Sequence, residues 1–286
     1  THFRDVGVQV DESTRRRVIA AQHDVLHIHW PEQHLNHRSR SYAYGRTLIL
    51  LAQLDYLRLR GTKIVWTVHN LAAHERRYPR FERWFWRQFI RRLDGYICLT
   101  DASRELALAR FPGLGRLPGA VIPHGHYRDF YPNTISRCEA RERLNVPHGA
   151  TLILFLGAVR EYKNVPLLVD AFRGLDDPDV LLVVAGKPSD AAIAREVHEH
   201  IAGDPRVRTA LAHVPDTELQ VYFGAADVVV LPYREILNSG SAILSLSFNR
   251  PVLLPASACG AELQGLVGSE WVRTYEGTLE TRHLRE

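Results

Sequence analysis

The sequence contains little cysteine, little lysine and no long hydrophobic run. Three cysteines, Cys98, Cys138 and Cys259, occur in 286 residues, and they cannot form the paired disulfide framework of a small secreted domain. The longest apolar runs, such as 152–159 and 180–186, have the length of a strand. They fall short of the roughly 18–20 residues that a membrane-spanning helix needs. The first residues lack the zones of a signal peptide, so we expect a cytoplasmic protein.

Lysine is rare among the basic residues. Only Lys63, Lys163 and Lys187 are lysines among 36 basic residues, and the others are arginines. A compact ammonium and a planar guanidinium are not interchangeable at a ligand site. Each lysine that the sequence keeps is therefore a candidate for a specific contact with a ligand.

Charge is unevenly distributed along the chain. Residues 1–128 contain 21 Lys/Arg against 11 Asp/Glu, and residues 129–286 contain 15 against 21. The segments 111–119 and 123–134, where the change occurs, are rich in Gly, Pro, Asn and His, which is typical of a linker. We therefore predict two domains, one over 1–128 and one over 129–286.

Strand and helix patterns alternate in both halves. Apolar strand candidates lie at 24–30, 63–69, 94–100, 119–125, 151–157, 180–186, 207–213, 227–233 and 251–255. Helical stretches lie between many of them, for example at 44–59, 101–110, 165–175, 190–202, 216–225 and 240–248, with Asp101 or Ser103 able to cap the second. Continuous Val/Leu/Ile runs joined by helices predict parallel strands with right-handed crossovers. The predicted fold is α/β, with two Rossmann-like domains whose parallel sheets face each other across a cleft.

A basic and aromatic segment, RYPRFERWFWRQFIRRLDGY, predicts an amphipathic helix that begins near Pro79. The cationic positions at helical spacing are Arg80, Arg83, Arg87 and Arg91, and the aromatic ones are Phe81, Phe85 and Phe89. One interpretation is an arginine face exposed to solvent and an aromatic face packed against the rest of the domain. The other is a dock for anionic lipid headgroups or a phosphorylated acceptor. We do not expect nucleic acid to bind, because the acidic second half would repel it.

The segment FLGAVREYKN (155–164) combines a glycine with two cations. Gly157 ends a strand, and Arg160 and Lys163 follow just before a helix. Ligands of open α/β sheets bind beyond the carboxyl ends of the strands, and cations beside a helix N-terminus favour anions. The segment therefore predicts a phosphate site, with an ordinary cationic surface loop as the alternative.

A second polar loop lies in LPYREILNSGSAILSLSFNRPVLLP (231–255). Asn238, Ser239, Gly240 and Ser241 occupy the first turn of a predicted helix, whose free N–H groups could hold a diphosphate. Capping of the helix by Asn238 or Ser239 would also explain the residues. Together, the two loops suggest one diphosphate held from two sides.

Several histidines and one lysine have more than one interpretation. His27, His29 and His69 could approach one another, but no carboxylate or cysteine joins them at ligand spacing, so we predict no metal site there. In the linker, His124 and His126 either pack in a hinge or approach the cleft. Lys187 follows a strand end and is either a surface lysine or a contact to the nucleotide.

Four segments in the second half resemble the donor domain of retaining GT-B glycosyltransferases of group 1, the GT4-like set. They are FLGAVREYKNVPLLVDAF, VLLVVAGKP, HVPDTELQVYFGAADVVVLPYREILNSGS and NRPVLLP. TVHN and VIPHG in the first half resemble the family's acceptor-domain strand end and linker. The resemblance implies transfer of a sugar from a nucleotide diphosphate sugar with retention of configuration. It also implies no obligatory metal or other cofactor, and an acceptor that is a sugar, a lipid-linked molecule or a small molecule. If the arginines at 80, 83, 87 and 91 dock on lipid, the inner face of the membrane is a second expected location.

The resemblance also assigns roles to residues. Arg160 and Lys163 match the basic pair that contacts the donor diphosphate and stabilises the leaving group. His69 matches a histidine near the reaction centre, which orients the sugar and can handle a proton. Gly157 and the turn 238–241 match backbone donors to phosphate and sugar, and Lys187 lies where the nucleotide base is expected. Closure about the linker would exclude water from the activated sugar.

One feature of the family is absent. Many members have two glutamates eight residues apart around the second loop, and the aligned positions here are Ile236 and Leu244, with Glu235 a displaced candidate for the first. A catalytically degenerate sugar-nucleotide binding protein is therefore an alternative, as is another enzyme of this fold such as an epimerase or a phosphorylase. The sequence leaves the nucleoside, the sugar and the acceptor open.

Overall fold

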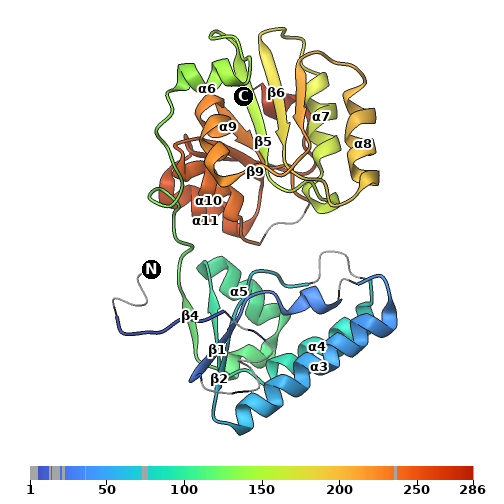
Figure 1. The fold of residues 1–286 in the computed structure, drawn as a ribbon, viewed down its shortest axis with the longest axis vertical. Coiled ribbons are helices and arrows are strands. Elements are labelled where there is room, and N and C mark those ends of the chain that lie inside the picture. Colours follow the sequence, from blue (N-terminus) through green and yellow to red (C-terminus); the bar gives the residue numbers. More distant parts are fainter. Residues whose placement is uncertain are drawn as a thin grey trace. The chain divides into compact units, whose positions relative to one another are not determined.

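The protein consists of two compact units in a computed structural model that describes residues 6–12, 14, 20, 23–35, 37–72, 77–234 and 237–285 (Figure 1). The N-terminal unit is Thr1–Ile122 and the C-terminal unit is Pro123–Glu286. This division precedes the expected boundary at 128 because the linker residues bond to the C-terminal unit. The Tyr127 backbone N–H donates to Ser247 Oγ (2.9 Å), and Arg128 Nη2 donates to Asn249 Oδ1 (2.7 Å).

The N-terminal unit contains a parallel sheet of four strands in the order of the chain, β1-β2-β3-β4. The strands are β1 (Val25–Ile28), β2 (Lys63–Thr67), β3 (Gly95–Cys98) and β4 (Gly119–Val121). The helices are η1 (Pro31–Leu35), α3 (Arg40–Leu59), α4 (Pro79–Ile90), α5 (Asp101–Arg110) and η2 (Pro112–Arg116). These strands lie within the four predicted segments.

Aromatic packing forms the centre of this unit. Trp66 on β2 contacts Trp86 and Phe89 on α4, with ring centroids 5.2 and 5.6 Å apart, and all three side chains are buried. Helix α4 corresponds to the predicted amphipathic helix. The phenylalanines at 85 and 89 are buried, and the arginines at 80, 83, 87 and 91, which we call the α4 stripe, are all exposed. The cap of α5 differs from expectation. Thr100 caps the helix and forms a reciprocal pair with Ser103.

The C-terminal unit contains a parallel sheet of six strands in the order β10-β9-β8-β5-β6-β7. The strands are β5 (Thr151–Leu156), β6 (Val180–Ala185), β7 (Val207–Ala210), β8 (Val228–Val230), β9 (Val252–Pro255) and β10 (Val272–Tyr275). Counted from β5, this is the Rossmann order 3-2-1-4-5-6. The order reverses between β5 and β8, and ligands of such sheets bind at that reversal. The prediction of two Rossmann-like α/β domains with parallel sheets is confirmed.

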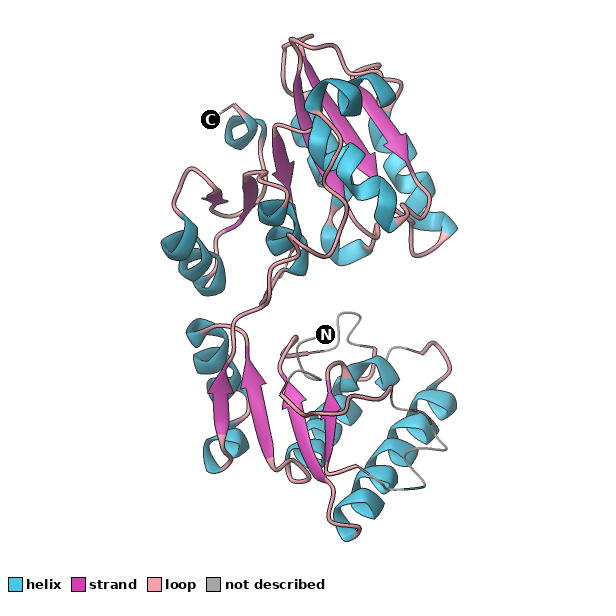
Figure 2. Ribbon diagram, turned by 60° about the vertical axis from the view of Figure 1, so that its left-hand side comes forward, coloured by secondary structure: helices cyan, strands magenta, loops and turns pink. Residues whose placement is uncertain are grey.

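Helices cover both faces of this sheet (Figures 1 and 2). They are α6 (Arg137–Arg143), η3 (Glu161–Lys163), α7 (Val165–Arg173), α8 (Ala191–Ile201), η4 (Asp216–Glu218), α9 (Leu219–Ala225), α10 (Gly240–Ser247), α11 (Ala258–Val267) and η5 (Thr281–Leu284). The sequence patterns missed α6, α11 and β10. Among the described residues, no helix combines the length and the apolar character required to cross a bilayer.

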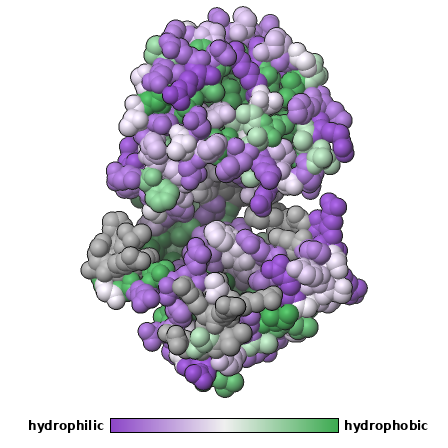
Figure 3. Space-filling model, in the orientation of Figure 1, coloured by the Kyte–Doolittle hydropathy of each residue, from purple (hydrophilic) through white to green (hydrophobic). Residues whose placement is uncertain are grey.

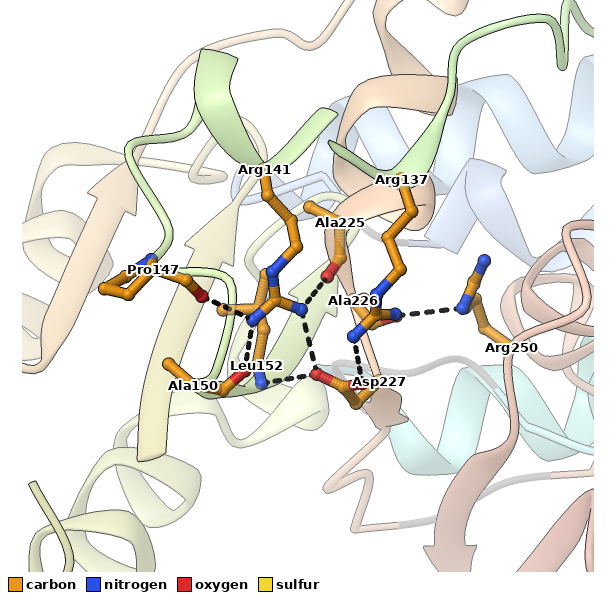
Figure 4. Close-up of polar contacts among 9 residues, drawn as sticks. All are labelled: Arg137, Arg141, Pro147, Ala150, Leu152, Ala225, Ala226, Asp227 and Arg250. Carbon is orange, nitrogen blue, oxygen red and sulfur yellow. Dashed lines mark hydrogen bonds and ion pairs between the residues drawn. The ribbon is translucent and has the colours of Figure 1, made fainter. Parts of the chain in front are cut away.

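A buried arginine ties α6 to the strands. Arg141 is 1% exposed and donates to the carbonyl oxygens of Pro147, Ala150 and Ala225 (Figure 4). It also pairs with the Asp227 carboxylate, which accepts from the Leu152 N–H (2.8 Å) at the start of β5. These bonds fix α6 and the loop before β5 against the beginning of β8.

Candidate functional site

Two glycines allow the ends of β5 and β6 to approach closely. Gly157 has φ +144° and Gly186 has φ +138°, a conformation that side chains rarely adopt. A Cβ at Gly186 would overlap the backbone of Gly157. The following loops then bond to each other, because the Val159 N–H donates to the Lys187 carbonyl (3.0 Å) and the Ser189 N–H donates to the Val159 carbonyl (2.9 Å).

Lys163 at the end of η3 is a buried cation. Its side chain lies over the ring of Tyr233, with Nζ 5.2 Å from the ring centroid, and the residue is only 8% exposed. Burial, reinforced by the nearby charge of Arg160, lowers the pKa of Lys163 to about 8. Within the described ranges, no carboxylate pairs with this ammonium. A buried charge without a counter-ion is unfavourable, so the site favours an anionic ligand.

The second loop supplies the start of α10 and two buried polar groups. Ser239 caps the helix, since its Oγ accepts from the Ala242 N–H (3.0 Å), so the capping interpretation holds for Ser239. Asn238 Nδ2 is buried and forms no hydrogen bond with the described part of the protein, whereas the buried Tyr233 hydroxyl interacts with the side chains of Ser239 and Ser241. Burial raises the pKa of Tyr233, whose hydroxyl lies beside Ser239 and Ser241 and stays protonated. The loop therefore has an unused donor, Asn238 Nδ2, where the helix N-terminus also favours anions.

The two predicted phosphate loops meet at the end of β5. A Cβ placed on Gly157 would lie 3.0 Å from Lys163 Nζ and 3.9 Å from Ser241 Oγ. Because Tyr233 follows β8, these groups lie on both sides of the point where the strand order reverses. We refer to Gly157, Lys163, Asn238 and Ser241, with the Tyr233 ring beside them, as the anion cluster.

Linker residues also reach this cluster. His124 Nε2 and Tyr127 Oη lie 3.6 and 3.7 Å from the position of a Cβ on Gly240, and the two atoms are 3.4 Å apart. His124 thus packs beside the start of α10, whereas His126 is exposed. Sequence reasoning gave no role in the site to Tyr127 or to Tyr233, the last residue of the predicted strand 227–233.

Other predicted residues have weaker connections to the cluster. Arg160 is exposed and acts on Lys163 through its charge. The backbone of Lys187 bonds to the loop after β5, but its side chain is exposed and no described contact joins it to the cluster. Glu235 and Ile236, where the family's first glutamate was sought, lie outside the described residues. Leu244 lies on α10 and is half-buried.

Histidines gather in the N-terminal unit at the ends of β1 and β2. His29 Nδ1 lies 2.9 Å from His69 Nε2, and Trp30 stacks on His69 with ring centroids 4.7 Å apart. Partial burial lowers the pKa of His29, which favours its neutral form. His27 bonds to Thr67 Oγ1 (2.7 Å), and its ring lies beside that of His29, with ring centroids 4.4 Å apart. The arrangement offers an imidazole pair beside the exposed Trp30 ring, which is suited to sugar stacking and proton transfer.

A buried carboxyl group lies next to these histidines in the chain. Glu32 on η1 is 2% exposed and accepts a hydrogen bond from Asn70 Nδ2 (2.7 Å), and Asn70 directly follows His69. Burial raises the pKa of Glu32 to about 7. Sequence reasoning missed this residue, because a single glutamate after a strand resembles any surface carboxylate.

Comparisons with known proteins identify the family to which this chain is similar. Residues 136–242 match the family model "Glycosyl transferases group 1". A GDP-mannose:glycolipid 4-beta-D-mannosyltransferase from Xanthomonas campestris pv. campestris is 34% identical over 278 residues. That alignment covers 97% of this chain and 74% of the relative.

Solved structures show the same architecture. HepE from Anabaena, in complex with UDP-glucose, has a TM-score of 0.69 at 15% identity, covering 94% of this chain and 69% of that one. Sucrose-phosphate synthase from Thermosynechococcus elongatus has a TM-score of 0.65 at 21% identity, covering 91% of this chain and 62% of that one. At such identities the likeness establishes the fold alone.

Proposed function

Since the chain belongs to the group 1 glycosyltransferases and has the GT-B fold, we propose that its anion cluster binds the diphosphate of a nucleotide sugar. The N-terminal unit then binds the acceptor. The observation that carries this proposal is the buried Lys163 ammonium, which has no carboxylate partner in the described ranges and lies next to the start of α10. A diphosphate supplies the missing negative charge.

The same groups support catalysis. As the bond between sugar and diphosphate breaks, negative charge grows on the leaving group, and fixed positive charge is most effective at that point. Lys163 is held in place by burial and by the Tyr233 ring, so little reorganisation is needed. Arg160 adds a second positive charge from the exposed side. We propose that these cations take the place of an obligatory divalent metal, and equal turnover with and without EDTA would support this.

For the donor, we propose GDP-mannose. The Xanthomonas relative uses GDP-mannose by name, and it is similar along 97% of this chain. The structure of HepE, in contrast, is a complex with UDP-glucose, but HepE is only 15% identical to this chain. A thermal-shift screen with GDP, UDP, ADP and dTDP tests this proposal, because a ligand that binds only the folded form raises the melting temperature. The largest shift should occur with GDP, and a larger shift with UDP would contradict the choice.

The same relative bears on stereochemistry. Its name specifies a β-mannosyl product, and the mannose of GDP-mannose is α-linked, so forming a β-linkage inverts the anomeric centre. We propose inversion for this chain, in place of the retention that the resemblance implies. Inversion needs a base for the acceptor hydroxyl, and the His29–His69 pair can accept that proton to become an imidazolium. The anomeric signals of the product in an NMR spectrum decide between the two outcomes.

The central test compares Lys163 with an exposed lysine. We expect Lys163→Ala to lower kcat/KM by about 100- to 1000-fold, the loss typical when a group that stabilises developing charge is removed. Lys63→Ala is the matched control, because its side chain is 67% exposed and lies in the N-terminal unit, and we expect little change in kcat/KM. Circular dichroism checks that both variants fold. Normal turnover by Lys163→Ala would remove the assignment, and nucleotide binding without turnover by the unaltered protein would favour the sugar-nucleotide binding alternative.

Gly240→Ala tests whether the ligand contacts the backbone at this position, with little effect expected on the fold. A Cβ at Gly240 meets its nearest neighbours at 3.6 and 3.7 Å, which are ordinary contacts, so the fold has room for it. If the diphosphate lies against the backbone here, the methyl group displaces it. We therefore expect unchanged thermal stability and weaker GDP binding in this variant. Unchanged GDP binding would exclude backbone contact at Gly240.

We also propose that the N-terminal unit docks on anionic lipid headgroups, which fits a lipid-linked acceptor such as the glycolipid named for the Xanthomonas relative. The four arginines of the α4 stripe are exposed. On the neighbouring helix α3, Leu48, Ile49 and Leu59 are 51, 52 and 87% exposed. Figure 3 shows hydrophobic patches among hydrophilic ones along the edge of the unit where α3 runs in Figure 1. Exposed apolar and basic side chains together are typical of surfaces that bind the membrane interface.

Vesicle sedimentation tests this surface. Vesicles with anionic lipid should pellet the protein at low salt and less of it at high salt, because salt screens the attraction. The replacement of Arg80, Arg83, Arg87 and Arg91 by Gln should abolish the effect. Replacement of the exposed Arg104, Arg110 and Arg116 in the same unit is the control. Equal sedimentation of both variants would leave the stripe as ordinary surface.

A further inference from the structure

Three potential metal ligands lie together on α6 and the loop that follows it. Cys138 and Glu142 are one helical turn apart, and Cys138 Sγ is 3.5 Å from Glu142 Oε1. His148 returns to the same place, with its Nε2 3.9 Å from Cys138 Sγ. One ligand atom from each residue lies within 4.8 Å of the other two, and all three residues are exposed. Among the described residues, this is the group that meets the spacing of a metal site.

The spacing is close to that of ligands around zinc. With Zn–S about 2.3 Å and Zn–N about 2.0–2.1 Å at tetrahedral angles, a bound sulfur and a bound nitrogen lie about 3.6 Å apart. The observed distances of 3.5 and 3.9 Å differ little from that value. Side-chain rotations alone can therefore bring the three atoms onto one ion. Thiolate, imidazole and carboxylate are all zinc ligands, and the two acidic groups supply the charge that balances Zn²⁺.

The backbone beneath the ligands is held in place. Arg141, on the buried face of α6, donates to the carbonyl oxygens of Pro147 (2.9 Å) and Ala150, which flank His148 in the loop. The Val146 N–H in turn donates to the Arg141 carbonyl (2.8 Å). Figure 4 shows the Arg141 side chain directed toward the carbonyl groups of this loop. The loop that carries His148 is therefore ordered relative to the helix that carries Cys138 and Glu142, which lowers the entropy lost on binding.

We propose that Cys138, Glu142 and His148 form a zinc site with water as the fourth ligand. On binding, the Cys138 thiol releases its proton to solvent and binds as thiolate. The site lies before the start of β5, whereas the anion cluster lies at the carboxyl end of the same strand. It is independent of the proposed donor site, and its bound ion ties α6 to the loop before β5.

Metal titration of the chelator-treated protein tests this proposal. Co²⁺ should bind with one equivalent and produce a near-ultraviolet thiolate-to-cobalt charge-transfer band and visible ligand-field bands, which Zn²⁺ should remove by displacement. Cys138→Ser should lose the charge-transfer band. Glu142→Gln and His148→Ala should each weaken binding at least tenfold, since even the loss of residues that only support ligands costs 10- to 100-fold in affinity. Zn²⁺ should also raise the melting temperature of the unaltered protein, by an amount that grows with the logarithm of the free Zn²⁺ concentration once this exceeds the Kd.

Two controls match the ligands. Glu139 lies on the same helix but pairs with Arg143 (3.2 Å), so Glu139→Gln should bind Co²⁺ normally. His213 is an exposed histidine elsewhere in the unit, and His213→Ala should also bind normally. The absence of a charge-transfer band at stoichiometric Co²⁺ would overturn the proposal. So would the same band in Cys138→Ser, which would place the metal at another cysteine, or equal weakening by the control variants.

Discussion

Both units have an α/β architecture with a parallel sheet, but their candidate functional groups differ in how deeply they are buried. In the C-terminal unit the strand order reverses between β5 and β8, and residues from both sides of this reversal enclose a buried cation. In the N-terminal unit the strands follow the order of the chain, and the His29–His69 pair lies at an exposed sheet end. The reversal thus brings loops from both of its sides around one buried cation, whereas the N-terminal sheet, whose strands follow the order of the chain, keeps its histidine pair at an exposed end.

Charge also has different roles in the two units. In the C-terminal unit Arg141 is buried and bonds to three carbonyl groups and Asp227. In the N-terminal unit the pair between Lys63 and Asp94 has a lysine side chain that is 67% exposed. Buried charges depend strongly on their partners, while exposed pairs contribute little. The comparison therefore predicts unequal effects of similar substitutions.

The largest effect on stability is expected from Asp227→Asn. This change leaves the buried Arg141 and its neighbour Arg137 without their counter-ion. Breaking a buried pair typically destabilises a protein by about 3–5 kcal/mol. Because Arg141 keeps its carbonyl partners, we expect a loss of unfolding free energy at the lower end of this range. Urea unfolding that follows the C-terminal unit measures the loss. A change under about 1 kcal/mol would show that the network contributes no more than a surface pair.

A second substitution, His69→Ala, tests whether the two units contribute differently to turnover and to GDP binding. His69→Ala should lower kcat by about 100-fold, as expected when a group that accepts a proton is lost. GDP affinity should not change, because the anion cluster is untouched. Lys163→Ala should lower both. Parallel measurement of kcat and of GDP binding by calorimetry distinguishes the two patterns, and weaker GDP binding in His69→Ala would contradict the division of roles.

The third prediction concerns pH and the N-terminal unit. Folding raises the pKa of Glu32 to about 7 from its ordinary value of 4.5, so the folded state binds more protons between these values. The unfolding free energy therefore falls as pH rises from about 4.5 to 7. Glu32→Gln removes this loss and can still accept from Asn70, so it should stabilise the unit by about 3 kcal/mol at pH 8 and have little effect at pH 4. Melting curves at both pH values test the sign, and a less stable variant at pH 8 would contradict it.

The smallest effect is expected from Lys63→Ala. Its ammonium bonds to Asp94 Oδ1 (3.1 Å), but Asp94 keeps its bond from the Ile64 N–H (3.0 Å). The unfolding free energy should change by less than about 1 kcal/mol, the usual range for an exposed pair. Chemical denaturation measures it. A loss as large as that of Asp227→Asn would remove the distinction between the two units.

Local patterns predicted most of the strands and the residues of both phosphate loops. Lys163 stood out because lysine is rare in this chain, and the NSGS turn stood out because it begins a helix after a strand. Tyr233, Tyr127 and Glu32 could not be selected in this way. Their significance comes from burial and neighbours, such as the ring of Tyr233 under Lys163, and neither is visible in the order of residues along the chain.

By itself, the sequence determined the α/β class, the division into a basic and an acidic part, and the chemical types available at the strand ends, because these depend on local composition and hydrophobic period. Only the tertiary structure decided which strand ends meet. The order β8-β5-β6 placed Gly157 near both Lys163 and Ser241, and the bonds from Arg141 to the loop before β5 hold His148 near Cys138. Strand order and burial arise from contacts between segments far apart in the chain, so no local pattern encodes them.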